Sequence, residues 1–384
     1  MAENNIRIPF NIPTLIGNEL EFISDAISNR KISGDGEYTK KCCQLMEQRY
    51  DIKKVLLTTS CSSALDMSAI LTGINAADEV ILPSYTFTST ANSFLTRGAS
   101  LKFIDIREDT LNIDENKIEK AINKKTKAIV LVHYAGVSCE MEKIREITKK
   151  NNIYIIEDAA QAMDSKYNER YLGSIGDIGC YSFHETKNLT CGEGGAILIN
   201  NSQFIERAEI IREKGTNRSK FYRGEVDKYT WVDIGSSFLP SEILSAFLYA
   251  QLENVEIITN NRKKCWNYYY DNLDKLESKG FLSRPTIPYN CEHNGHLFYI
   301  ILENQNIRNS LIDYLKREGI LAVFHYIPLH LSPMGKKLGY NIGDLPITER
   351  ISSTLLRLPL YYDISKEEQK KVIDSICKFF YKNS

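Results

Sequence analysis

Three short apolar segments, rich in β-branched residues, follow one another over residues 154–200. The first ends at Glu157 and Asp158, and the second leads to Lys187. The segments are 154–156, 178–183 and 196–199. Short apolar runs bounded by glycine predict buried strands of an α/β sheet. Because ligands of parallel sheets bind at the carboxyl ends of the strands, Asp158 and Lys187 are expected to face one site.

A lysine and an acid at neighbouring strand ends suit one cofactor in particular. Pyridoxal phosphate needs an amine that bonds to its aldehyde and a carboxylate that keeps its ring nitrogen protonated. Taken alone, Lys187 is far more often a solvated surface lysine, and an aspartate such as Asp158 at a strand end is often a helix cap. The position of Lys187 between an apolar strand and a glycine-rich hairpin favours the functional interpretation.

At these residues the chain resembles the DegT/DnrJ/EryC1/StrS sugar aminotransferases. The matching strings, in the family's order, are EDAAQA, GSIGDIGCYSF, SFHETKN and GEGGAILIN. The similarity runs from IPFNIP to LRLPLYY. It implies a fold-type I pyridoxal-phosphate transferase: an α/β domain with a large, mostly parallel seven-stranded sheet and helices on both faces, and a smaller α+β C-terminal domain. We expect the large domain, with an N-terminal arm, over residues 1–255 and the small domain over 256–384, joined by a long helix.

Further strings narrow the resemblance within the family: HYAGVSCEM, REKGTNRS, VDKYTW and VFHYIPLH. They imply amino transfer from L-glutamate to C4 of dTDP-4-keto-6-deoxy-D-glucose, giving dTDP-4-amino-4,6-dideoxy-D-galactose and 2-oxoglutarate for a bacterial surface polysaccharide. The family also implies a homodimer with shared active sites. Alternatives are another nucleotide-sugar 3- or 4-aminotransferase, the family's dehydratase branch, against which Lys187 argues, and a non-catalytic binding relative.

The resemblance implies which residues contact the ring of the cofactor. Lys187 and Asp158 are the catalytic pair, and Gln161 matches the contact to the ring's phenolic oxygen. Phe87 matches the aromatic residue that stacks on the ring. From the residues alone, an aromatic side chain after a strand is more often part of the core.

Serine hydroxyl groups are expected to bind the phosphate of the cofactor. A strand that gives way to a serine-rich helix start, as at Ser62 and Ser63, offers N–H groups, a favourable dipole and hydroxyl donors to an anion, although an ordinary N-cap looks the same. Ser182 matches a further phosphate contact. Ser237 stands where many relatives have an asparagine that reaches the partner's phosphate.

The sugar nucleotide is expected beside four residues. His325 and Tyr326 lie in FHYIPLH, Asp35 lies in a Gly-Asp-Gly turn, and Arg218 lies in a polar, aromatic segment without periodicity. A plain surface turn around Asp35 and a dimer-interface loop around Arg218 remain open. His133, at another strand end, is either a core histidine or a site residue.

Composition limits the partners. The 384 residues carry 48 Lys and Arg against 49 Asp and Glu, which indicates neither a nucleic-acid nor an anionic-membrane partner. No segment approaches the roughly 20 apolar residues of a membrane span, and no signal peptide is apparent at the N-terminus. Nine scattered cysteines without a CxxC pair predict neither a disulfide framework nor a metal site. We therefore expect a cytoplasmic protein.

Fewer helices and strands are predicted in the C-terminal part of the sequence. Strands are expected at 296–302 and 322–326, helices at 255–274, 307–318 and 366–381, and an extended loop at 216–231.

Overall fold

A seven-stranded sheet forms the centre of the computed structural model, which describes residues 6–382. Its strand order is β1-β9-β8-β5-β4-β2-β3, and β9 alone runs antiparallel to its neighbours. The strands are β1 (Lys54–Thr58), β2 (Glu79–Pro83), β3 (Ser100–Ile104), β4 (Thr126–Val132), β5 (Tyr154–Asp158), β8 (Ile178–Ser182) and β9 (Gly195–Ile199).

Helices cover both faces of this sheet, because successive strand residues point to opposite sides. On β5, Ile155 packs into one hydrophobic cluster and Ile156 into the other. The cluster of Ile156 includes residues of α3 (Cys61–Leu71), α4 (Thr88–Leu95) and α7 (Ile205–Arg212). The cluster of Ile155 includes residues of α2 (Glu37–Tyr50), α5 (Glu115–Ala121), α6 (Met141–Asn151) and α9 (Glu242–Glu253). The expected α/β class with a mostly parallel sheet is confirmed.

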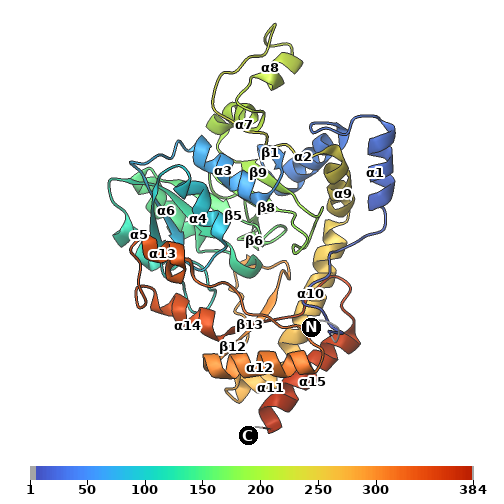
Figure 1. The fold of residues 1–384 in the computed structure, drawn as a ribbon, viewed down its shortest axis with the longest axis vertical. Helices are drawn as coiled ribbons and strands as arrows, with labels where there is room; N and C mark the ends of the chain where they lie inside the picture. The colour runs from blue at the N-terminus through green and yellow to red at the C-terminus, as the bar shows by residue number, and fades with distance from the viewer. Residues whose placement is uncertain (1–5, 383–384) are drawn as a thin grey trace.

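A second, antiparallel sheet of order β10-β12-β13 organises the C-terminal part. Its strands are β10 (Leu282–Ser283), β12 (Phe298–Leu302) and β13 (Leu355–Leu358). The helices near it are α11 (Asp274–Ser278), α12 (Gln305–Arg317), α14 (Pro346–Thr354) and α15 (Lys366–Lys382). The long α10 (Val255–Asn272) runs from the large sheet to this part (Figure 1), with Ile258 in the core of the first and Tyr269 in the core of the second.

The N-terminal segment and a small sheet connect these parts. In the N-terminal segment, Ile8 pairs with Ile320 and packs into the C-terminal core. A small antiparallel sheet joins β6 (Lys166–Tyr167) and β7 (Arg170–Tyr171) to β11 (Cys291–Glu292). The division at residue 255 stays a prediction.

The structure corrects two local expectations. Residues 322–326 do not form a strand: only Val323 makes a bridge, to Arg357. The chain then turns away, with Tyr326 in the left-handed region at φ 38°, and the side chain of His325 points into the large domain. The expected loop at 216–231 contains a short helix, α8 (Arg218–Tyr222).

The remaining elements are short. They are α1 (Glu19–Ser28), α13 (Pro333–Lys337) and the 3₁₀ turns η1 (Tyr134–Gly136), η2 (Ser202–Phe204) and η3 (Leu329–Leu331). Within residues 6–382, none of the helices has the length and apolarity that a membrane crossing requires.

Candidate active site

The loop between β8 and β9 fixes the backbone of Lys187. Phe183 and Cys191 pair across its base, with the N–H of Cys191 donating to the carbonyl of Phe183 at 3.0 Å. The N–H of Glu185 donates to Gly192, and that of Lys187 donates to His184 at 2.9 Å. The antiparallel β9 makes this loop a tight hairpin, which presents the lysine at the carboxyl end of β8.

The amine of Lys187 is held in a partly buried position. Its Nζ makes no hydrogen bond or ion pair with any of residues 6–382 that the structure records. Burial lowers the pKa of Lys187, while Cys61 and Asp158 act in the opposite direction. Because the neutral amine is the nucleophile, this environment favours the form that bonds to an aldehyde.

Asp158 is buried at the end of β5, the parallel neighbour of β8. Thr90 Oγ1 donates to its Oδ2 at 2.7 Å, and the N–H of Ala160 donates to its Oδ1 at 3.2 Å. Burial raises the pKa of Asp158, and the hydrogen bonds of Thr90 and Ala160 and the charge of Lys187 oppose that rise. Each carboxylate oxygen has room for one further donor. A protonated ring nitrogen fits this position and would offset the desolvation of the carboxylate.

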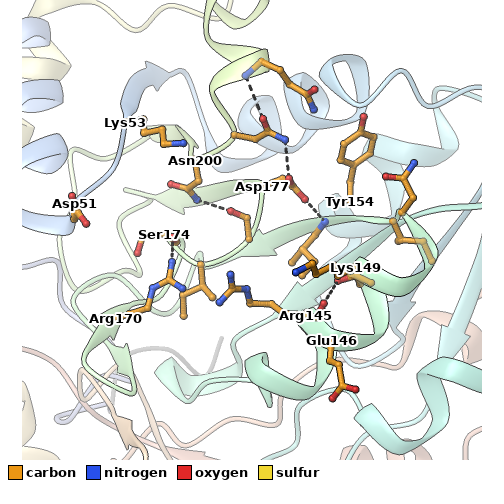
Figure 2. Close-up of a pocket in the computed structure, with 18 residues that line it drawn as sticks. Asp51, Lys53, Arg145, Glu146, Lys149, Tyr154, Arg170, Ser174, Asp177 and Asn200 are labelled. Atoms are coloured by element: carbon orange, nitrogen blue, oxygen red, sulfur yellow. Dashed lines mark hydrogen bonds between the residues drawn. The ribbon is translucent and has the colours of Figure 1, made fainter.

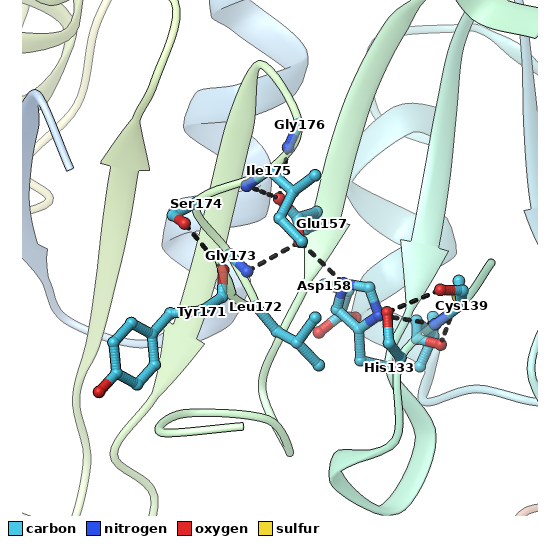
Figure 3. Close-up of polar contacts among 12 residues, drawn as sticks. His133, Cys139, Glu157, Asp158, Tyr171, Leu172, Gly173, Ser174, Ile175 and Gly176 are labelled. Atoms are coloured by element: carbon cyan, nitrogen blue, oxygen red, sulfur yellow. Dashed lines mark hydrogen bonds and ion pairs between the residues drawn. The ribbon is translucent and has the colours of Figure 1, made fainter. Parts of the chain in front are cut away.

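The preceding acid, Glu157, has a different environment (Figure 3). Its oxygens accept hydrogen bonds from the N–H groups of Gly173, Ile175 and Gly176 and from His133 Nε2 at 2.9 Å. The Nδ1 of His133 accepts from the N–H of Cys139 at 3.2 Å. His133 is therefore a core histidine with both nitrogens bonded, and of the two interpretations of its role the structural one holds.

Hydroxyl groups gather at the first turn of α3. Ser62 Oγ lies 2.6 Å from Ser89 Oγ, and Ser63 Oγ lies 2.8 Å from Thr59 Oγ1. Ser60 caps the helix by accepting from the N–H of Ser63 at 3.1 Å. A helix N-terminus with several hydroxyl donors is a site that fits a phosphate group.

Ser182 and Ser237, the other two serines assigned to the phosphate, differ in their exposure. Ser182 is buried at the end of β8, and its Oγ accepts from the N–H of His184 at 3.4 Å. Ser237 is exposed and pairs with Glu213. The residue after it, Phe238, accepts a hydrogen bond from the N–H of Thr59 at 2.9 Å, so Ser237 lies close in the chain to the hydroxyl cluster.

Two side chains assigned to the cofactor ring lie at the same sheet edge. Phe87 follows β2 and is 59% exposed, so its ring is available to a ligand. Gln161 is fixed at both ends of its amide: its Oε1 accepts from the N–H of Ala135 at 2.7 Å, and its Nε2 donates to the hydroxyl of Tyr326 at 2.9 Å. Gln161 thus connects the cofactor-binding edge with the segment expected to bind the sugar.

His325 and Tyr326 reach this edge from the C-terminal part. The hydroxyl of Tyr134 and Nδ1 of His325 share a hydrogen bond at 2.7 Å, and the rings of His325 and Tyr326 stack with centroids 3.6 Å apart. Tyr85 donates to the carbonyl of His325 at 3.1 Å. Burial, Arg357 and Lys187 hold the pKa of His325 well below its usual value, so the ring is neutral.

Asp35 and Arg218 are not brought to Lys187 within this chain. Asp35 accepts a hydrogen bond from Arg212 Nη2 at 2.6 Å in the turn before α2. Arg218 pairs with Glu213 at 2.9 Å on α8, which projects beyond α7 at one end of the molecule (Figure 1). Their assignment to the sugar stays a prediction.

A recess of about 920 Å³ lies at the opposite, amino ends of the strands (Figure 2). Its polar groups serve the fold: Asp177 accepts from the N–H of Ile155 at 2.9 Å, and Asn200 donates to Gly173 and Gly176. Neither Lys187 nor Asp158 lines it. We therefore place the active site at the carboxyl edge despite the size of this recess.

Sequence reasoning did not single out three residues of the site. Thr90 bonds to Asp158 from the first turn of α4, and Tyr134 holds His325. Arg357 on β13 donates its Nη2 to the carbonyl of Phe324 at 3.0 Å. Tyr134 follows a strand end, a position that signals a ligand site, whereas nothing local marks Thr90 or Arg357.

The fold and this constellation define a fold-type I transferase that uses pyridoxal phosphate: a free lysine, a buried acid and a hydroxyl-lined helix N-terminus surround one sheet edge. Comparison with known proteins agrees. The model of the DegT/DnrJ/EryC1/StrS aminotransferase family matches residues 13–377, and the chain belongs to that family. Solved structures of the fold include the putative sugar aminotransferase Spr1654 from Streptococcus pneumoniae in a form with pyridoxal phosphate, at 24% identity and a TM-score of 0.90.

Three similar proteins span nearly the full length. An uncharacterized protein of Methanocaldococcus jannaschii is 32% identical over 390 residues, covering 100% of both chains. GDP-perosamine synthase of Escherichia coli O157:H7 is 28% identical over 374 residues, covering 97% of this chain and 98% of that one. The structure of an aminotransferase from Psychrobacter cryohalolentis matches with a TM-score of 0.91 and 26% identity, covering 97% and 98%.

Proposed function

We propose that the chain is a dTDP-4-amino-4,6-dideoxygalactose transaminase. It transfers the amino group of L-glutamate to C4 of dTDP-4-keto-6-deoxy-D-glucose, and 2-oxoglutarate and dTDP-4-amino-4,6-dideoxy-D-galactose are the products. The two half-reactions balance without an external oxidant, because the donor carbon loses the amine and hydrogen that the sugar carbon gains. The observation that carries the aminotransferase chemistry is the unpaired amine of Lys187 beside the buried Asp158. The identity of the sugar substrate is supported by the sequence strings that narrow the resemblance within the family, such as HYAGVSCEM and VFHYIPLH.

The bound cofactor supplies the aldehyde that carries the amino group and the ring that withdraws electrons from the reacting carbon. Asp158 accepts the ring N–H and keeps the nitrogen protonated, and Thr90 orients its carboxylate. Lys187, with a pKa lowered by burial, takes the proton from the donor carbon as a neutral amine and returns it at the carbon that receives the amine. Ser62 and Ser63 hold the phosphate.

The sugar half-reaction needs a second set of contacts. The neutral ring of His325 and the hydroxyl of Tyr326, held by Tyr134 and Gln161, face the same edge as Lys187. We propose that they bind the keto sugar, with Asp35 of this chain and Arg218 of a second copy completing the sugar site in a homodimer. Ser237 of the second copy would reach the cofactor phosphate. The product then serves a bacterial surface polysaccharide, such as lipopolysaccharide or enterobacterial common antigen, and the protein acts in the cytoplasm.

A second candidate is amino transfer to another nucleotide sugar, including a GDP-linked one. The observation in its favour is the 28% identity to GDP-perosamine synthase along nearly the whole chain. Both candidates use the same lysine and acid, so they differ only in the sugar and the nucleotide.

An absorption spectrum tests both steps. Purified protein with pyridoxal phosphate should show a visible band that is absent in Lys187→Ala, and L-glutamate should convert it to the band of the aminated cofactor. Addition of dTDP-4-keto-6-deoxy-D-glucose should restore the first band and yield the 4-amino sugar by NMR. A band that glutamate converts and only a GDP-linked keto sugar restores would select the second candidate. No band in the wild type would refute an aminotransferase.

A further inference from the structure

Arg357 is a cation without a counter-charge at the edge of the active site. It forms no ion pair with any of residues 6–382 that the structure records. Its Nε is buried without a hydrogen-bond partner, and its Nη2 donates to a neutral carbonyl, that of Phe324. Burying a charge without a partner costs free energy, so such a group normally has an anionic ligand.

The strand register points Arg357 toward the site. Arg357 on β13 is the cross-strand partner of Tyr299 on β12, so the two side chains project to the same face of the small sheet. On that face the ring of Tyr299 lies 5.9 Å from the ring of Tyr134, which holds His325. The backbone of Arg357 also pairs with Val323, at the start of the segment that carries His325.

The N-terminal arm connects Arg357 with the loop of Lys187. The guanidinium lies over the ring of Phe10, 4.6 Å from its centroid. The next residue, Asn11, donates its side-chain amide to the carbonyl of Glu185 at 3.3 Å, two positions before Lys187. Arg357 and the loop of Lys187 therefore contact neighbouring residues of one arm. Consistent with this proximity, Arg357 contributes to the lowered pKa of Lys187.

From this geometry we propose that Arg357 binds a carboxylate of the amino donor, an inference that rests on the aminotransferase function proposed above. In an α-amino acid the carboxylate is attached to the carbon that carries the reacting amine. A cation that receives it must therefore lie on the side of the site that holds Lys187, and Arg357 contacts the arm that also bonds to the loop of Lys187. The diphosphate of a 4-keto sugar nucleotide is attached to C1, across the ring from the reacting carbon. A planar guanidinium matches a carboxylate with two parallel hydrogen bonds.

Arg357→Gln removes the charge and leaves a shorter polar side chain. Arg357→Lys keeps the charge but cannot make the two parallel hydrogen bonds of a guanidinium. Arg308→Gln is the matched control. Arg308 also contacts Phe324, with its guanidinium 5.8 Å from the ring centroid, and it is not among the groups that shift the pKa of Lys187. In single-turnover spectra with L-glutamate, we expect Arg357→Gln to raise the half-saturating concentration about 10- to 100-fold, as for loss of a bidentate charge-assisted pair. Arg357→Lys should recover part of this loss, and Arg308→Gln should stay near the wild type. The maximal rate should change less than half-saturation.

The second half-reaction identifies the source of the anion. With the aminated cofactor in place, the keto sugar nucleotide should react with Arg357→Gln at a half-saturating concentration within about threefold of the wild type, because no carboxylate is present to lose its bidentate partner. A defect confined to this half-reaction would refute the donor carboxylate and assign Arg357 to the diphosphate. Equal saturation of Arg357→Gln and the wild type by glutamate would also overturn the proposal.

Binding without turnover separates this proposal from the proposed function. Glutarate is an unreactive dicarboxylate, and calorimetry on the cofactor-free protein should show its affinity reduced at least tenfold in Arg357→Gln and unchanged in Arg308→Gln. If wild-type protein does not react with glutamate, the proposed function fails, while the glutarate measurement still decides the role of Arg357. Equal glutarate affinity in Arg357→Gln and the wild type would refute the carboxylate site. Unfolding midpoints of the variants show whether any loss reflects misfolding.

Discussion

Glu157→Gln tests whether the acid next to Asp158 serves the fold. Glu157 is fully buried, and its two oxygens accept hydrogen bonds from three backbone N–H groups and His133. The amide of glutamine replaces one oxygen by a donor. If the new NH2 group takes the place of Oε1, it faces the N–H groups of Ile175 and Gly176. If it takes the place of Oε2, it faces the N–H of Gly173 and the imidazole of His133. In either orientation two accepted hydrogen bonds are lost.

The magnitude follows from those contacts. A hydrogen bond to a charged group contributes about 1.5–3 kcal/mol, so two lost bonds predict a destabilisation of about 3–6 kcal/mol. Burial alone would raise the pKa of Glu157, but the hydrogen bonds from His133, Gly176 and Gly173 hold it below the ordinary 4.5. Its stabilising contribution is therefore fully present above pH 4.5 and disappears as the pH falls through the lower, folded-state pKa. In Glu157→Gln, the free energy of unfolding should therefore fall less steeply than in the wild type as the pH is lowered below 4.5.

Urea unfolding of the cofactor-free protein measures the change, and hydrogen exchange locates it at the amides of 173–176. Glu256→Gln is the control, because Glu256 is 73% exposed and its pair with Arg49 is worth about 0–1 kcal/mol. An unfolding midpoint of Glu157→Gln equal to that of Glu256→Gln, with unchanged exchange at 173–176, would refute the assigned role of Glu157.

Three further outcomes are expected. Thr90→Val removes the hydrogen bond to Asp158, a bond to a charged acceptor worth about 1.5–3 kcal/mol, and should slow the glutamate half-reaction about 10- to 100-fold in stopped-flow spectra; an unchanged rate would contradict the orienting role of Thr90. Lys187→Met should stabilise the cofactor-free protein at neutral pH, because the folded-state pKa of Lys187 lies below 10.5 and protonation favours the unfolded chain. This gain, read from urea midpoints, should shrink as the pH rises toward 10.5, and a constant gain would argue against a lowered pKa. Tyr134→Phe frees His325 Nδ1 and should raise KM for the keto sugar nucleotide about three- to tenfold without changing saturation by glutamate, as for a neutral hydrogen bond of about 1 kcal/mol; equal effects on both substrates would contradict it.

The sequence predicts the large sheet well because its strands are short, apolar and β-branched, and every residue of β8 and β9 is buried. The same pattern misleads at 322–326. The run Ala-Val-Phe-His-Tyr has strand-like composition, but the side chains of His325 and Tyr326 bond to Tyr134 and Gln161 of the large domain. Tertiary contacts decide that segment, and its composition alone does not show them.

The sequence suggests the candidate site where a strand end carries a charged or reactive group, as for Asp158 and Lys187. It does not suggest Thr90 and Arg357, because each makes its contacts with a distant part of the chain. Thr90 bonds to Asp158 across 68 positions, from a helix with the polar sequence TSTANSFL. Arg357 reaches the site through the pairing of β12 with β13, and a strand of four residues gives little signal of its own.

The adjacent acids of β5 show why the choice between them depends on the alternation of a strand. Asp158 shares a face with Ile156, on the side of α3 and α4, where Thr90 and the hydroxyl cluster lie. Glu157 shares a face with Ile155, on the side where the turn 173–176 and His133 consume its hydrogen-bonding capacity. The helix N-terminus proposed to bind the phosphate lies on the first face, so an acid on that face is the one that could contact the ring of the same cofactor. The position of α3 relative to β5 therefore supports the proposed role of Asp158, while Glu157 serves the fold.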